Sequence, residues 1–467
     1  MLSPLLVSVA FFATFVLVIV LVFRPQEIWP VLNAFRLLDV FTALAAIGVG
    51  IDFALRKLRH PYSPQLPFIG GFLLSAYVVT VLFMGRTGIG LATSRALIAA
   101  IFMLAVTYGA RTPSRLRTLV GLLVGLALVV GGIAIQQGRS EPVCLEIPAY
   151  TDSARDDDDF MGEPDGRNCE TRADCSRGGR GDVDYECERL GMFHTVSVER
   201  RVRWRGQLAD PNELAVFLGG VLPFLLAALA ASKSWFSKLL ALAAMAVLLY
   251  AIILTQSRGG QLVVAVVFAV YFAMRFGVKG VVAAGVLALP VILLGGRDGS
   301  KADASADERQ GVLYDAITSF AYHPFGQGID QFTEDHRITA HNAYVLAAVD
   351  LGFVGFVAWS GLLWASLKIP IAIIRRPPQN LDPTLRALAV ALTVSLIGVS
   401  IGIFFLSFTY KQLLFVWLGI AGALYGAVKN DDPTFEVKIG GKDLAGIIAG
   451  DLVMLAIIFV YTRLNPK

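Results

Sequence analysis

Long apolar stretches separated by short polar segments dominate the chain. A helix that crosses a hydrocarbon core of about 30 Å needs roughly 20 apolar residues, and about thirteen stretches meet that requirement. We expect them at residues 2–23, 37–55, 67–84, 92–110, 118–137, 212–231, 237–254, 259–275, 279–296, 342–366, 386–407, 411–428 and 443–462. The pattern predicts an all-α polytopic membrane protein with about 12–14 transmembrane helices. The first stretch is too long and lacks a small-residue cleavage site, so we interpret it as a retained anchor and not as a signal peptide.

Composition agrees with this pattern. Of the 467 residues, 56% are hydrophobic and 16% are charged, whereas a soluble domain carries about 25% charged residues. A water-soluble globular protein is therefore excluded as the main architecture. The formal net charge of +4 is too small to suggest nucleic acid as a partner.

Basic residues gather in alternate short loops, which predicts the orientation of the chain. The basic loops hold Arg56, Lys57, Arg59; Arg111, Arg115, Arg117; Lys233, Lys238; Arg275, Lys279; Lys368, Arg375, Arg376; and Lys429, Lys438, Lys442. The intervening short loops hold few: Arg24, Arg36, Arg86, Arg95, Arg258 and Lys411. By the positive-inside rule the basic loops and the amino terminus face the cytoplasm.

The same alternation of loops places two long loops on the outer side of the membrane, and these loops divide the chain into five parts. We expect N-terminal transmembrane helices over 1–137, an outer cysteine-rich acidic loop over 138–211 and central transmembrane helices over 212–296. An outer loop over 297–341 and C-terminal transmembrane helices over 342–467 follow.

All four cysteines lie in the first outer loop, on the oxidising side of the membrane: Cys144, Cys169, Cys175 and Cys187. Their even number predicts two disulfides, with three possible pairings. A metal site is disfavoured because the spacings form no paired C-x-x-C knuckles. The loop also carries an acidic run, Asp156 to Asp159, but no calcium-loop pattern with its closing glutamate, so we interpret the acids as solvated.

The second outer loop is predicted to contain an amphipathic helix. Ser305 and Glu308 have the spacing of a capping box, and Val312, Leu313, Ile317 and Phe320 then recur at near-helical spacing until His323-Pro324. We expect this helix to lie at the outer membrane interface.

Polar residues converge on the outer ends of three spans. The three clusters are Arg203-Trp204-Arg205-Gly206-Gln207-Leu208-Ala209-Asp210-Pro211-Asn212-Glu213-Leu214-Ala215, Thr255-Gln256-Ser257-Arg258-Gly259-Gly260, and His341-Asn342-Ala343-Tyr344 with Asp350. Guanidinium groups and helix amino termini both suit phosphate oxygens. For any single arginine, snorkelling to lipid headgroups or pairing with Asp210 or Glu213 is the simpler interpretation. Together with Gly259-Gly260, which allows close backbone approach, the arginines favour an anion site.

The third cluster offers acid–base chemistry. His341 can accept a proton at physiological pH, and Asn342 can cap the helix or bind a sugar hydroxyl. A zinc site is not expected, because His336 and His341 have no H-E-x-x-H partner. Asp350 and Asp451 lie inside predicted spans, where acids are costly, so each is a functional candidate. Alternatively, each is protonated or paired with a polar group of a neighbouring helix, and the sequence suggests no partner for Asp451.

These residues resemble a known family. The run from Asp307-Glu308-Arg309 through His323-Pro324-Phe325-Gly326-Gln327-Gly328 to His341-Asn342-Ala343-Tyr344 and Asp350-Leu351-Gly352-Phe353-Val354-Gly355 is similar to the signature region of the O-antigen ligase and polymerase superfamily. Thr255-x-Ser257-Arg258-Gly259-Gly260, and Arg203-x-x-Gly206 with Asp210-Pro211-Asn212-x-x-Ala215, resemble its upstream motifs. Each motif alone is loose, but their order and spacing over residues 200–430 make the resemblance specific.

The resemblance implies a GT-C-like glycosyltransferase of the bacterial inner membrane, with its active site facing the periplasm. Its donor would be a glycan on polyprenyl (undecaprenyl) diphosphate, with no metal and no cofactor. Arg258 and His341 would be catalytic: Arg258, with Arg203 or Arg205, would hold the diphosphate, and His341 would act at the acceptor hydroxyl. Arg203 fits the R-x-x-G spacing better than Arg205, and both remain candidates. Asn212, Ser257, Asn342, Tyr344 and Asp350 complete the expected substrate-binding set.

The chemistry agrees with this implied role. Cleavage of the sugar C1–O bond builds negative charge on the diphosphate, which fixed guanidinium groups stabilise, and a neutral imidazole can take the acceptor's proton. Attack opposite the leaving group would invert the anomeric centre. The cysteine-rich insertion before Arg203 is longer than the family pattern leads us to expect.

Three functions compete. A polymerase would join repeat units into O-antigen or exopolysaccharide, and we favour it because the stapled loop could bind a long polysaccharide. A ligase would move a finished glycan onto lipid A core. A flippase would carry charges along several mid-membrane helices. Beyond the donor, we expect an acceptor glycan or lipid A core and the bilayer as partners, with chain-length regulator and flippase proteins as candidates.

Overall fold

The structure is a computed structural model that describes residues 8–57, 60–147, 163–177, 179, 183–294, 299–336, 339–379 and 381–464. Within these residues, 11 segments are long and apolar enough to cross a membrane. They are α3 (Leu37–Ala54), α4 (Leu66–Met84), the run α5–η2–α6 (Arg86–Gly109), α7 (Pro113–Arg139), α9 (Pro211–Ala231), α10 (Trp235–Leu254), α11 (Arg258–Phe276), α15 (Ala343–Arg375), α16 with η6 (Pro383–Phe405), α17 (Gln412–Asp431) and α18 (Gly441–Leu464).

Two shorter apolar helices are α1 (Val9–Phe23) and α12 (Val278–Leu294). Every stretch predicted from hydropathy therefore contains a helix, although residues 2–7 of the first lie outside the described residues. The predicted fold class, an all-α polytopic membrane protein, is confirmed.

Some predicted boundaries are wrong. The span expected to end at residue 366 continues as α15 to Arg375, which the prediction placed in a basic loop. Another error concerns the fourth span. The span expected from residue 92 starts at Arg86, directly after Gly85, whose φ of 60° ends α4. The helix continues through η2 (Thr93–Leu97), a π-helical turn that contains Arg95. Arg95 is therefore inside a helix and not in a short loop. Arg86, Thr87 and the two glycines of α5 interrupt the apolar pattern, and glycine is a poor helix former, so a search for an uninterrupted apolar stretch misses this helix start.

The remaining elements are short or lie between the spans. They are α2 (Pro25–Ile28), η1 (Pro30–Phe35), β1 (Pro142–Ile147), β2 (Glu163–Asn168), α8 (Arg172–Ser176), β3 (Asp184–Arg189), η4 (Met192–His194), η5 (Gly206–Leu208), α13 (Gly299–Tyr322) and α14 (Gln331–His336).

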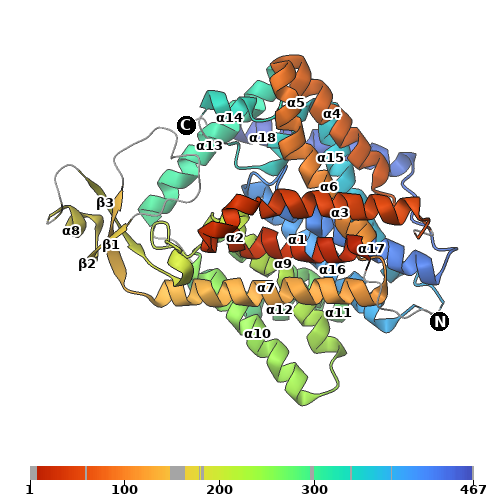
Figure 1. Cartoon of the computed structure of the whole chain (residues 1–467), viewed down its shortest axis with the longest axis horizontal. Coiled ribbons are helices and arrows are strands. Elements are labelled where there is room, and N and C mark those ends of the chain that lie inside the picture. Colours follow the sequence, from red (N-terminus) through yellow and green to blue (C-terminus); the bar gives the residue numbers. More distant parts are fainter. Residues whose placement is uncertain are drawn as a thin grey trace. The chain divides into compact units, whose positions relative to one another are not determined.

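The chain forms two compact units. Unit 1 comprises residues 1–17, 39–120 and 298–467, and unit 2 comprises residues 18–38 and 121–297. In unit 1, α15 packs against α4, α13, α16, α17 and α18, and α17 packs against α6. In unit 2, α9 packs against α10 and α11, and α11 packs against α12. Figure 1 shows these helices.

The centre of each unit is a nearly enclosed helix. In the apolar stretch of α17, 89% of the residues are buried, and in that of α9, 78% are buried. The corresponding shares for α3 and α18 are 22% and 17%. Because apolar side chains on such helices stay uncovered by protein, a lipid environment accounts for them.

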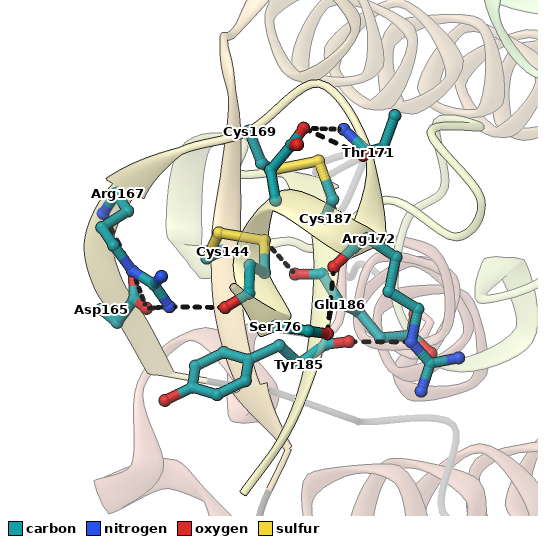
Figure 2. Close-up of a disulfide and its surroundings, with 12 residues drawn as sticks. Cys144, Asp165, Arg167, Cys169, Thr171, Arg172, Ser176, Tyr185, Glu186 and Cys187 are labelled. Carbon is teal, nitrogen blue, oxygen red and sulfur yellow. Dashed lines mark hydrogen bonds and ion pairs between the residues drawn. A yellow bond between two sulfur atoms is a disulfide. The ribbon is translucent and has the colours of Figure 1, made fainter. Parts of the chain in front are cut away.

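The cysteine-rich segment of unit 2 folds into a small antiparallel sheet with the strand order β2-β1-β3. Disulfides join Cys144 to Cys175 and Cys169 to Cys187, which resolves the three pairings left open by the sequence (Figure 2). Cys144 and Cys187 lie opposite each other on β1 and β3, so the two bridges fasten α8 and the end of β2 to this pair of strands. The acidic run Asp156 to Asp159 lies outside the described residues.

The amphipathic helix of the second loop is present as α13, and it ends at Tyr322, just before His323-Pro324. The expected capping box is wrong, because the helix begins at Gly299 and runs through Ser305. Ala302, Ala304 and Ala306 are strong helix formers and extend the helix towards its amino terminus. Its position at a membrane interface stays a prediction.

Candidate functional site

Arg201 joins two of the polar motifs in unit 2. Asp210 caps α9 by accepting a 2.7 Å hydrogen bond from the backbone N–H of Asn212, and Pro211 occupies the first helical position. The Asn212 Oδ1 atom accepts a 3.0 Å hydrogen bond from Arg201 Nη2, and the Thr255 carbonyl accepts one of 2.8 Å from Arg201 Nε. The buried Arg201 guanidinium thus holds the start of α9 to the turn that precedes α11. The sequence offered no signal that separates Arg201 from its arginine neighbours.

The Thr255–Gly260 motif builds the start of α11. Ser257 is buried and caps the helix, its Oγ accepting a 3.0 Å hydrogen bond from the Gly260 N–H. A Cβ on Gly260 would lie 2.3 Å from the Cβ of Ala215 in α9, so this glycine allows the two helices to touch. Arg258 is the first residue of α11. Its side chain is exposed and makes no hydrogen bond or ion pair with the residues that the structure describes.

Arg203 and Arg205 are held differently from Arg258. The Arg203 backbone N–H donates to Gln137 Oε1 at 2.9 Å, and its Nε donates to the Val196 carbonyl at 2.7 Å. Arg205 is buried, and its Nη2 donates to the Phe193 carbonyl. Both guanidinium groups therefore bind backbone carbonyls, and Arg258 is the exposed arginine of the three.

Gly206, the glycine of the R-x-x-G motif, makes room for another arginine. Its φ is 53°, and a Cβ there would lie 2.0 Å from Nε of Arg24. Arg24 also forms a 3.2 Å ion pair with Glu27. The sequence placed Arg24 only in a short loop, because residues so far apart in the chain give no local sign of contact.

The His341-Asn342 motif forms the start of α15 in unit 1. Asn342 caps the helix, its Oδ1 accepting hydrogen bonds of 3.0 Å from the N–H groups of Tyr344 and Val345. Its buried Nδ2 makes no hydrogen bond within the described part of the chain. His341 is half-buried and has a φ of 47°, a left-handed conformation that is uncommon outside glycine. The cap thus fixes the backbone that carries the imidazole.

Tyr344 braces this helix start. Its hydroxyl donates to the Ser400 carbonyl at 2.9 Å, and its ring packs edge-on against Trp359 with centroids 5.2 Å apart. Thr409 completes the brace, since its Oγ1 donates to the Ala343 carbonyl at 2.7 Å while its own carbonyl accepts from Trp359 Nε1 at 3.1 Å.

The His323–Gly328 motif pairs with a break in α15 at Gly352, where φ is 68°. The Gly328 N–H donates to the Asp350 carbonyl at 3.0 Å, and the Phe353 N–H donates to the Pro324 carbonyl at 2.8 Å. Asp350 is fully buried, and its Oδ2 accepts a 3.1 Å hydrogen bond from the Tyr410 hydroxyl. This glycine-rich motif therefore docks onto the interrupted helix.

The segment after this motif is anchored by contacts that the sequence did not reveal. Arg95 and Asp330 form an ion pair of 2.9 Å, and the Ile329 N–H donates to Thr80 Oγ1 at 3.2 Å. Asp451, for which the sequence suggested no partner, accepts a 2.6 Å hydrogen bond from Ser360 Oγ in α15.

A buried carboxyl connects the cysteine-rich sheet to the segment that carries Arg201. Glu188 in β3 accepts hydrogen bonds from the Ser197 hydroxyl and, at 2.8 Å, from the Arg200 N–H. Burial raises the pKa of Glu188, although both hydrogen bonds oppose that shift.

The cysteine sulfurs also form a potential metal cluster by distance. The Sγ atoms of Cys144, Cys169 and Cys175 lie within 4.8 Å of one another. All three sulfurs belong to disulfides, so this group offers no thiolate to a metal ion.

The predicted site residues fall into two groups, one in each unit. Unit 2 holds Arg203, Arg205, Asn212, Ser257 and Arg258, whereas unit 1 holds His341, Asn342, Tyr344 and Asp350. Within its own unit each group is locally organised by helix caps. Substrate contact by each of these residues stays a prediction.

Comparison with known proteins adds one family. Residues 243–360 match a family model described as O-antigen ligase, and no curated protein matches the chain. The matched region includes the Thr255–Gly260 motif, the docked His323–Gly328 motif and the start of α15. Over this region the chain is similar to the O-antigen ligase and polymerase superfamily that its sequence motifs resemble.

Proposed function

We propose that the protein is a glycosyltransferase that uses a polyprenyl-diphosphate-linked glycan as donor at the periplasmic face of the inner membrane. The observation that carries the proposal is the state of Arg258. Its exposed guanidinium lies at the amino terminus of α11, on a turn held by the buried Arg201, and makes no hydrogen bond or ion pair with the described residues. The O-antigen ligase match over residues 243–360 supports the same class of reaction.

Arg258 is suited to the leaving group. As the bond between the sugar C1 and the diphosphate oxygen breaks, negative charge grows on the diphosphate. A guanidinium and the backbone N–H groups at a helix start stabilise that charge more in the transition state than in the ground state. Because the turn is already ordered by Ser257 and Arg201, little reorganisation accompanies the reaction.

His341 is the proposed base. The acceptor hydroxyl oxygen attacks C1 and forms the new glycosidic bond, its proton passes to the imidazole, and the polyprenyl diphosphate departs with the bonding electron pair. The unused Nδ2 donor of Asn342 is a candidate for binding a sugar hydroxyl. Attack from the side opposite the diphosphate inverts the anomeric centre, and these proposed roles need no metal ion or cofactor.

Polymerisation of O-antigen or exopolysaccharide repeat units is the activity we favour, because the disulfide-linked sheet offers an additional ordered surface for a long glycan. Ligation to lipid A core is the second candidate, since the matching family supports ligase-type and polymerase-type functions alike.

The decisive experiment uses the full chain in nanodiscs with a polyprenyl-diphosphate-linked repeat unit, with and without lipid A core. We expect wild type to form new glycosidic bonds, and Arg258→Ala and His341→Ala to lose about 100-fold or more of the rate. Matched controls are Arg86→Ala, an exposed arginine at the start of α5, and His60→Ala. Both controls should retain wild-type rates.

The products distinguish the candidates. A ladder of longer lipid-linked glycans identifies a polymerase, and transfer only in the presence of core identifies a ligase. If wild type binds the lipid-linked glycan but forms no bond, transport of that lipid becomes the better hypothesis. Full activity of His341→Ala would exclude the imidazole as base.

A further inference from the structure

Unit 1 contains a cavity of about 1150 Å³ at the end of α15 that is far along the helix from Asn342. Its walls are the last turns of α15, from Trp364 to Arg375, together with lining residues between Arg376 and Leu381, Val428 and the segment 431–438. The ends of α15 and α17 thus meet at this cavity. None of its residues belongs to the proposed glycan-transfer site, so the inference is independent of that proposal.

Several charges that line the cavity are already paired. Lys368 Nζ forms 2.7 Å contacts with both carboxylate oxygens of Asp443, at the start of α18. Glu436 pairs with Lys438 at 3.1 Å. The Asp432 carboxylate accepts hydrogen bonds from both the backbone N–H and the hydroxyl of Thr434.

Two arginines remain uncommitted. The side chains of Arg375 and Arg376 are exposed, and neither guanidinium group makes a hydrogen bond or ion pair with any residue described by the structure. Of the lining acids, Asp431 alone also has a side chain without a hydrogen bond or ion pair within the described residues. The two arginines and this one aspartate leave a net charge of one positive unit at the cavity. Adjacent guanidinium groups on one rim are suited to the oxygens of a single phosphate.

The cavity also has the aromatic and cationic character of a membrane boundary. Trp364 is 38% exposed, and its Nε1 donates to Asp443 Oδ1 at 3.1 Å. Lys368 lies one turn further along α15 and binds the same carboxylate. Tryptophan and basic side chains at the ends of spans gather at the level of lipid headgroups.

We propose that this cavity binds the phosphate-bearing headgroup of a membrane phospholipid, with Arg375 and Arg376 holding the phosphate oxygens and Trp364 lying along the glycerol and upper acyl region. The cavity volume of about 1150 Å³ far exceeds that of an inorganic phosphate and lies slightly above the roughly 300–1,000 Å³ of small-molecule sites, which leaves room for a lipid headgroup and its glycerol. Basic pockets at the ends of transmembrane helices recognise headgroups in this way. The cavity lies among the basic residues that the positive-inside rule assigns to the cytoplasmic side. The lipid would therefore come from the cytoplasmic leaflet.

The test measures binding of phosphatidylglycerol to the delipidated full chain by native mass spectrometry, and the change in melting temperature that the lipid causes. Wild type should retain the lipid and melt at a higher temperature in its presence. The double variant Arg375→Gln with Arg376→Gln should raise the Kd about tenfold or more, since two charge-assisted hydrogen bonds are lost. The matched control is Lys233→Gln with Lys238→Gln, two exposed cations in the loop before α10 and at its start.

Further arms identify the source of the phosphate and guard against misfolding. Glycerol 3-phosphate and inorganic phosphate should bind far more weakly than the lipid, and equal binding by either would overturn the phospholipid assignment. Arg375→Lys with Arg376→Lys should restore most of the binding. A photo-crosslinking residue at Thr434, in an otherwise unaltered chain, should label the lipid. Wild-type affinity in the double glutamine variant, or no labelling from Thr434, would also refute the proposal.

Discussion

The Nη2 atom of Arg201 donates a 3.0 Å hydrogen bond to the Oδ1 atom of Asn212. Because the same guanidinium also binds the Thr255 carbonyl at 2.8 Å, it fixes the start of α9 to the turn that ends at Arg258. Asn212 in turn donates from Nδ2 to Asp210 at 2.8 Å. The Asp-Pro-Asn motif and the Thr-x-Ser-Arg-Gly-Gly motif are therefore two halves of one hydrogen-bonded unit, with Arg201 as its centre.

Replacing Arg201 by lysine should misplace Arg258. A single ammonium group cannot reproduce the fork that serves Asn212 and Thr255, and an unsatisfied buried partner costs about 1–3 kcal/mol. We expect the KM for the lipid-linked donor to rise about tenfold or more, because the proposed diphosphate contact loses its support. Steady-state kinetics in nanodiscs measure this, with Arg139→Lys, an exposed arginine at the end of α7, as control. A lower melting temperature with unchanged KM would mean that Arg201 is only structural.

Asn342 has two functions that substitutions can separate. Its Oδ1 caps α15, whereas its Nδ2 has no hydrogen-bond partner among the described residues. Asn342→Ser should keep the cap and lose the amide donor, so the melting temperature should be close to that of wild type while glycan transfer falls about tenfold. Asn342→Ala should lose the donor and also destabilise the protein by about 1 kcal/mol. Full activity of the serine variant would assign Asn342 to capping alone.

Gly352 should tolerate no side chain. Its φ is 68°, and a Cβ there would lie 2.2 Å from the carbonyl carbon of Phe325. Gly352→Ala should separate the docked glycine-rich motif from α15 and destabilise the protein by about 3 kcal/mol or more. Gly70→Ala, within α4 and with open space around its Cβ position, is the control and should be neutral or stabilising. Equal melting temperatures of the two variants would contradict this explanation of the helix break.

The spans and the helix caps could be predicted from sequence because both depend on local information. An apolar stretch of sufficient length is a candidate span wherever it occurs, and Asn342 precedes an apolar run as a cap does. The prediction that Ser305 begins a helix was wrong because it, too, used only local information. A capping-box spacing favours a helix start, but it does not set one when strong helix formers such as Ala302 and Ala304 precede it.

The contacts that organise the site could not be predicted, because they join residues distant in the chain. Nothing local distinguishes Arg201 from Arg203 and Arg205, and only the fold gives Arg201 the Thr255 carbonyl as an acceptor. The disulfide pairing likewise depends on the register of β1 and β3, which places Cys144 opposite Cys187 without joining them. Gly206 was recognised as part of a motif, but the sequence did not show why glycine is needed there. The structure gives the reason, because the side chain of Arg24, at the start of α2, occupies the space that a Cβ would fill.

Glu188 should make the junction between the cysteine-rich sheet and the Arg201 segment sensitive to pH. Burial raises its folded-state pKa above the unfolded value of about 4.3. The folded state therefore binds the proton more tightly, and the carboxyl's stabilising contribution is fully present below that unfolded value and is lost as pH rises through the folded pKa. Hydrogen exchange of peptides covering residues 184–203, corrected for the intrinsic pH dependence, should show protection that decreases over this window. Glu188→Gln, which keeps an acceptor oxygen but does not titrate, should remove the decrease, whereas Glu186→Gln on the same strand should leave it unchanged. Protection that increases with pH in wild type relative to Glu188→Gln would show that the hydrogen bonds from Ser197 and Arg200 outweigh burial.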